Sequence, residues 1–243
     1  MSKYTAQIIE VLKDWRHDML RDPSLFDKLS RRVQTSINKV IPEKVHQAIT
    51  AAIKQMVRGV LFGAEFTTGK FDKNISLQVR DALAKEKIDF YKKTAAAEGG
   101  ITGAGGILLG LADFPLLLGI KMKLLFELAS VYGIDIKNYK ERVYILYIFQ
   151  LAFSSPQHRR KIFLQMNNWE QFQKNLPEDI HEFDWRTFQQ EYRDYIDLAK
   201  MAQLVPVIGA PVGAIVNYRL INKLGKTAMN AYRLREIEKS LKN

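Results

Sequence analysis

The stretch from Thr94 to Ile134 constrains this chain most, because it is long, apolar and rich in glycine. Between Glu98 and Lys121 the only formal charge is Asp113. Within it, glycines follow one another at steps of four, three and four: Gly99, Gly103, Gly106 and Gly110. On an α-helix this spacing would place them in one line. A helical glycine costs about 1 kcal/mol relative to alanine, so we expect another backbone to approach this line closely.

Two further stretches repeat the same spacing of small residues. Gly59 and Gly63 lie four residues apart, and so do Gly209 and Gly213. In membranes and in compact bundles, such spacing lets two helices approach closely. We therefore predict that eight glycines serve helix packing: Gly59, Gly63, Gly99, Gly103, Gly106, Gly110, Gly209 and Gly213.

Helical periodicity extends over nearly the whole chain, and no segment indicates a strand with comparable strength. The predicted helices are Tyr4–Leu20, Leu25–Val40, Glu43–Phe66, one that begins at Asn74 or Ser76, Pro115–Tyr132, Asn138–Phe153, a short one from Pro156, Trp185–Leu204, and one from Tyr218 onward. This pattern predicts an all-α fold, a single multi-helix bundle with the glycine-lined apolar hairpin at its centre. We expect one domain over residues 1–243, with N-terminal helices in 1–70, a basic helix and the hairpin in 71–135, and C-terminal helices in 136–243.

The hairpin is predicted to turn at Asp113. Aspartate is a favoured N-cap, and Pro115 would stand in the first turn of the second arm, which Gly133 ends. The arm from Ile101 to Ala112 is little more than half of the roughly 20 apolar residues that a bilayer-spanning helix needs. A hairpin buried in a soluble bundle and a shallow re-entrant or surface-bound arrangement both stay open.

Composition and charge narrow the surroundings in which this chain works. Its 243 residues contain no cysteine, which excludes disulfides and thiolate sites and is compatible with a reducing compartment. The N-terminus is amphipathic and charged, so we do not expect a secretory signal peptide. A net charge of +11 favours acidic partners. We expect an anionic membrane surface or an integral membrane protein rather than nucleic acid, because nucleic-acid binding has no use for long apolar helices.

Basic residues gather in two stretches, Lys85 to Lys93 and Arg219 to Lys239. Well-placed cations contribute about 1 kcal/mol each to binding of anionic headgroups, although an ordinary solvated face would show the same residues. The candidate lipid contacts are Lys92, Lys93, Lys121, Lys123, Arg219, Lys223 and Lys226.

Signs of catalysis are sparse. Glu98 and Asp113 bracket the glycine stretch and form a candidate polar site, with helix capping as the simpler explanation of Asp113. The four histidines are scattered without the spacing of a metal site, and no nucleophile or dinucleotide motif is present. We predict no catalytic residues, no metal and no cofactor.

The sequence AAAEGGITGAGGILLGLADFPLLLGIKMKLLFELASVYG, from Ala95 to Gly133, resembles the signature region of the EcsC family. The resemblance continues through PVIGAPVGAIVNYRLI, from Pro206 to Ile221. It implies a bacterial protein in a membrane setting, because the founding member is encoded beside the subunits of an ABC transporter. It brings no catalytic residue and no cofactor.

We therefore expect a membrane-associated helical protein that binds anionic lipid or a membrane-protein partner without catalysis. An ABC transporter system is the partner that the resemblance suggests. The expected location is cytoplasmic, peripheral or re-entrant at the inner face of the cell membrane. Two alternatives stay open: an enzyme acting on a lipid or other hydrophobic substrate, and a soluble helical scaffold. The lipid, the partner and the oligomeric state do not follow from the sequence.

Overall fold

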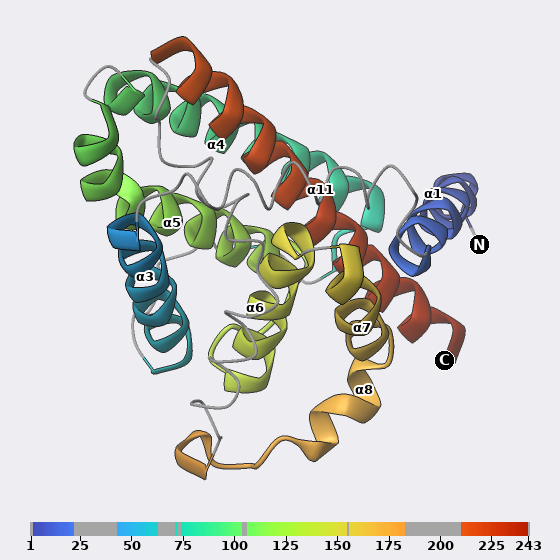
Figure 1. Ribbon diagram of the computed structural model, residues 1–243. Coiled ribbons are helices and arrows are strands. Elements are labelled where there is room, and N and C mark those ends of the chain that lie inside the picture. The colour runs from blue at the N-terminus through green and yellow to red at the C-terminus, as the bar shows by residue number, and fades with distance from the viewer. Residues whose placement is uncertain are drawn as a thin grey trace.

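The computed structural model describes residues 2–21, 43–62, 71, 74–103, 106–154, 156–182 and 210–242. Every regular element within these ranges is a helix, which confirms the all-α fold class (Figure 1). The α-helices are α1 (Lys3–Leu20), α3 (Glu43–Phe62), α4 (Leu77–Gly103), α5 (Gly106–Val131), α6 (Tyr139–Phe153), α7 (Pro156–Asn167), α8 (Trp169–Phe172) and α11 (Ala210–Lys242). Two short 3-10 helices, η1 (Gln173–Asn175) and η2 (Ile180–Glu182), follow α8.

Helices α4 and α11 lie side by side and antiparallel along much of their length (Figure 1). At one level of this pair, the ammonium of Lys92 lies 5.0 Å from the ring centre of Tyr218. At another, the guanidinium of Arg233 pairs with the carboxylate of Asp81. Helix α5 packs against α4, where Lys87 Nζ lies 3.0 Å from Glu127 Oε2. The pair of α4 and α11 carries the site described below.

Helix α6 is the interior of the fold. From Val143 to Phe153 its residues are apolar or aromatic except for Gln150, so this part can be stable only when covered on all sides. Every residue from Val143 to Phe153 is buried. Its Tyr144 packs against Trp169, with ring centres 4.9 Å apart, and against Tyr232 at 5.9 Å. These rings join α6 to α8 and α11.

Several helix ends follow the capping rules that the sequence suggests. Thr5 N donates to Ser2 Oγ at 3.0 Å, and Lys140 N donates to Asn138 Oδ1 at 2.9 Å. Ser76 precedes α4, and its hydroxyl accepts from Val79 N at 3.4 Å. After α5, Gly133 has a φ of +73°, and the flanking bonds Gly133 N to Ser130 O and Ile134 N to Ala129 O form a Schellman motif. The predicted role of Gly133 is thus confirmed.

The predicted turn at Asp113 is wrong. Helix α4 ends at Gly103, and α5 begins at Gly106 and continues through Asp113 and Pro115. The four glycines are divided two and two between these helices and do not form one line. Pro115 is exposed, while Phe114 beside it is buried.

Some predictions lie outside the described residues. These are the helix at 25–40, that at 185–204, and Gly63 and Gly209. The side-chain surroundings of residues 99–113 are likewise outside them, so the glycine lining of the hairpin stays a prediction. Among the helices that are described, none combines the length and apolar character that a membrane crossing requires.

Candidate functional site

An open groove runs between α4 and α11 and is closed at one edge by α1. We call it the cationic groove; its volume is about 510 Å³. Its lining residues are Val11, Lys85, Ile88, Asp89, Lys92, Asn222, Lys226, Met229, Asn230 and Arg233.

Helical spacing brings these residues to the groove. On α4, Lys85, Asp89 and Lys92 lie four and three positions apart, so they share one face. On α11, Asn222 and Lys226 are four positions apart, so they share one face of that helix. The antiparallel packing of α4 on α11 turns the two faces toward each other. Two basic stretches that are about 130 residues apart in the chain thereby reach one surface.

Charge in the groove is unbalanced. Asp89 is its one carboxylate among the described lining residues, and its Oδ1 lies 2.5 Å from Lys92 Nζ. This hydrogen bond lowers the pKa of Asp89 and raises that of Lys92. Lys85 and Lys226 are exposed, and neither forms an ion pair with another described residue. Two ammonium groups are therefore available to an incoming anion.

The floor of the groove is apolar. Ile88 and Met229 are buried there, and Val11 of α1 remains 46% exposed at the edge. A cationic rim above an apolar floor suits a ligand that carries an anionic group next to aliphatic carbon. The lining offers hydrogen bonds, charge and apolar contact.

A buried polar cluster below the groove fixes its walls. The carboxylate of Asp81, fully buried on α4, accepts from Arg233 Nε at 3.0 Å and from Tyr4 Oη at 2.5 Å. Tyr132 also donates to it. Burial, with the bond to Asp81, raises the pKa of Tyr4 to about 12, and burial raises that of Tyr132. One carboxylate thus ties α1, α4, the end of α5 and α11 together.

The sequence pattern of the last helix suggests that Arg233 and Arg235 lie on a basic outer face, but the structure buries both. Both are 7% exposed. Arg235 forms a bidentate pair with Glu141 of α6, at 2.6 and 2.8 Å, and stacks over Tyr144 at 4.5 Å. Both arginines join helices inside the fold, because α11 is covered on more than one side.

Lys121 is the clearest correction among the predicted lipid contacts. Its side chain is 0% exposed, and Nζ donates to Leu117 O at 3.2 Å. Burial lowers its pKa to about 7. A headgroup cannot reach it in this fold. Lys121 lies in an apolar, glycine-rich stretch, and this sequence context indicates burial although the charge of the residue does not.

The other predicted cations take three different positions. Lys92 and Lys226 line the groove. Lys123 pairs with Glu127 at 3.3 Å, one turn away on α5. The remaining three are exposed outside the groove: Lys93, Arg219 and Lys223. Lys85 and Asn222 were not among the predicted contacts, although their spacing from Lys92 and Lys226 could have indicated them.

The structure describes the surroundings of only some of the glycines predicted to serve helix packing. A Cβ at Gly59 would meet no atom within 4 Å in the described structure, so the prediction of close packing there is wrong. Gly213 lies in the first turn of α11. The close approach that the structure does show is at Gly225, where a Cβ would lie 2.5 Å from Ile88 Cγ1. Gly225 was missed because it has no small partner four residues away.

Glu98 and Asp113 lie within α4 and α5, and Glu98 is half-buried with a partner elsewhere in the chain. The side chain of Asp113 lies outside the described part, so nothing brings the two together as a polar site. Among the residues that are described, no group of three or more acidic or histidine side chains could hold a metal.

Comparison with known proteins gives a match along the chain. The model of the EcsC protein family matches residues 6–237. Protein EcsC of Bacillus subtilis (strain 168) is 48% identical over 228 residues, which cover 93% of this chain and 94% of that protein. Uncharacterized protein YdbA of the same organism is 28% identical over 258 residues, covering 97% of this chain and 94% of its own. No solved structure matches.

Proposed function

The chain belongs to the EcsC family, and from this premise we propose that it is a binding protein that attaches to the anionic inner face of the cell membrane through the cationic groove. One observation carries the proposal: Lys85, Lys92 and Lys226 converge from two helices on a groove with an apolar floor. Anionic phospholipids present a phosphate next to aliphatic chains, which fits this arrangement. Function by binding, without catalysis, is part of the proposal.

The groove is held in shape before any ligand arrives. Its two long walls are fixed by the pair of Asp81 with Arg233 and by the close contact of Gly225 with Ile88. Preorganisation lowers the entropy that binding must lose. Two exposed lysines on a rigid frame therefore bind one headgroup with a more favourable free energy than two lysines on a flexible tail would.

The test uses purified full chain and vesicles of phosphatidylcholine with or without phosphatidylglycerol. We expect Lys85→Glu with Lys226→Glu to weaken partition onto anionic vesicles about 30-fold or more. Each lysine contributes about 1 kcal/mol near such a surface, and 1.4 kcal/mol is a factor of ten. The measurement is the bound fraction against lipid concentration.

The matched control is Lys137→Glu with Lys239→Glu, which changes net charge equally at exposed sites outside the groove. Equal losses in both double variants would mean that total charge matters and the groove does not. If the unmodified chain binds neither vesicle type, the lipid proposal fails. The partner to test is then an acidic segment of a membrane protein, as in an ABC transporter system.

A further inference from the structure

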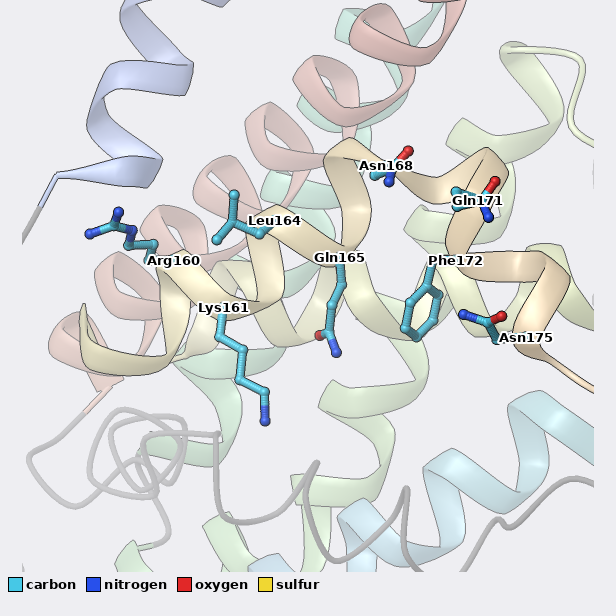
Figure 2. A pocket seen from close by; sticks show the side chains of 8 residues that line it. All are labelled: Arg160, Lys161, Leu164, Gln165, Asn168, Gln171, Phe172 and Asn175. Carbon is cyan, nitrogen blue, oxygen red and sulfur yellow. The ribbon is translucent and has the colours of Figure 1, made fainter.

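A second hollow lies where α7 is followed by α8 and η1 (Figure 2). We call it the amide pocket; its volume is about 610 Å³, within the range of small-molecule sites. The residues that line it are Arg160, Lys161, Leu164, Gln165, Asn168, Gln171, Phe172 and Asn175. It shares none of these with the cationic groove.

Four carboxamides distinguish this lining: Gln165, Asn168, Gln171 and Asn175. Each carboxamide presents two N–H donors and one carbonyl acceptor in a plane. None of the described lining residues is acidic. Figure 2 shows Lys161, Gln165 and Phe172 projecting to the same side of the chain. Carboxamides can form hydrogen bonds with neighbouring hydroxyl groups, because each hydroxyl both donates and accepts.

Three of the carboxamides are available to a ligand. The side chains of Gln165, Asn168 and Asn175 make no hydrogen bond to another described residue, and Gln171 Oε1 accepts only a long bond from Lys174 at 3.5 Å. Asn168 precedes α8, yet its side chain does not cap that helix. Local helix structure therefore does not account for these amides.

The wall that carries them is firmly supported. Phe172 N and Gln171 N donate to Asn168 O at 2.9 and 3.1 Å. The ring of Phe172 packs at 5.4 Å from Trp169 and 5.5 Å from Tyr147. Trp169 is buried in the aromatic cluster of α6. The backbone of the pocket is thus anchored to the core.

We propose that the amide pocket binds a phosphorylated sugar or polyol. The carboxamides would bond its hydroxyls, and Leu164, 51% exposed, with the half-buried Phe172 would meet the C–H face of its ring. Arg160 and Lys161 are the charged side chains among the described lining residues, and both are cationic. Both also interact elsewhere in the chain, so the proposal takes from them only a preference for anions. Free sugar phosphates and inositol phospholipid headgroups share this chemistry.

The test follows the side-chain amide signals of the ¹⁵N-labelled full chain by NMR. Its arms are glucose 6-phosphate, glucose, inorganic phosphate and a short-chain phosphatidylinositol below its micelle concentration. We expect at least one of the two phosphorylated polyols to shift the signals of the four carboxamides saturably, with a Kd at least tenfold below those of glucose and phosphate. Which of the two binds tighter tells the free metabolite from the headgroup.

Variants assign the binding to the pocket. Gln165→Ala and Asn168→Ala should each raise that Kd at least tenfold, while Gln55→Ala, an exposed carboxamide on α3, should leave it unchanged. Circular dichroism checks that each variant keeps its helix content. Binding of inorganic phosphate as tight as that of the polyol phosphates would reduce the pocket to a plain anion site and overturn the proposal. Absence of saturable shifts in every arm, or equal loss in all three variants, would overturn it too.

Discussion

Asp81 joins side chains from segments that lie far apart in the sequence. Its buried carboxylate holds Arg233, Tyr4 and Tyr132. Removing one partner of a buried pair leaves the other charge uncompensated, which costs more than the pair contributes net. We expect Asp81→Ala to lower the free energy of unfolding by about 3 to 5 kcal/mol, measured by urea denaturation.

Asp89 supplies the matched control, because it is an exposed carboxylate on the same helix and also pairs with a cation, Lys92. Asp89→Ala should cost less than about 1 kcal/mol. Adding Arg233→Met to Asp81→Ala should restore part of the loss, since no unpaired guanidinium is then buried. Equal effects of the two aspartate variants would contradict this account of the cluster.

Lys121 makes stability rise with pH, as salt-bridged carboxylates do at acid pH, but in a neutral to alkaline range. Its pKa of about 7 in the folded chain is below the roughly 10.4 of an exposed lysine. Below pH 7 the folded chain holds a buried charge, and the full penalty applies. Between these two values folding must release a proton, so stability rises with pH until the penalty is gone.

Lys121→Met should therefore stabilise the chain by a few kcal/mol at pH 6.5 and by much less at pH 10. The measured quantity is the difference in free energy of unfolding between variant and unmodified chain at each pH, which removes the contribution of other titrating groups. A difference that stays constant over this range would show that Lys121 does not titrate as a buried amine.

At the scale of the helix, Gly225 determines how closely α11 can approach α4. A Cβ there would lie 2.5 Å from Ile88 Cγ1 and 3.0 Å from Cγ2, so both branches of this side chain block it. Gly225→Ala gains up to about 1 kcal/mol of helix propensity but overpacks the interface. We expect net destabilisation of about 1 to 2 kcal/mol, measured by thermal and urea unfolding.

Gly59→Ala is the control, because open space surrounds that position and only the gain in propensity remains. It should stabilise the chain slightly. In an Ile88→Ala background, Gly225→Ala should no longer destabilise. If Gly225→Ala and Gly59→Ala had the same effect, close contact of α4 with α11 would be refuted.

Local rules predicted the helix ends well and the hairpin turn badly. Asn138, Ser76 and Gly133 act within one or two turns of their own position, so sequence alone identifies them. Asp113 and Pro115 carry equally strong local signals, yet α5 continues through them. Burial of Phe114 and its neighbours outweighs one lost backbone hydrogen bond, and packing of this kind depends on distant helices.

At the scale of the whole molecule, sequence reasoning found the ingredients of the groove without their arrangement. The two basic stretches were evident, and two of the predicted lipid contacts, Lys92 and Lys226, line the groove. The faces of α4 and α11 that meet are determined by the antiparallel packing of these two helices. This packing is a contact between segments far apart in the chain. For the same reason Lys121, Arg233 and Arg235 were taken for surface charges and are buried.

The central claim is that the cationic groove attaches this chain to an anionic membrane surface. Co-sedimentation of the detergent-free chain with neutral and with anionic vesicles, at low and at high salt, tests it most directly. We predict binding to anionic vesicles only, weakened by salt, because the charges involved are exposed and screened. Absence of binding, equal binding to neutral vesicles, or binding that high salt leaves unchanged would contradict the claim, and the last result would indicate insertion of the apolar stretch from Ile101 to Ile120.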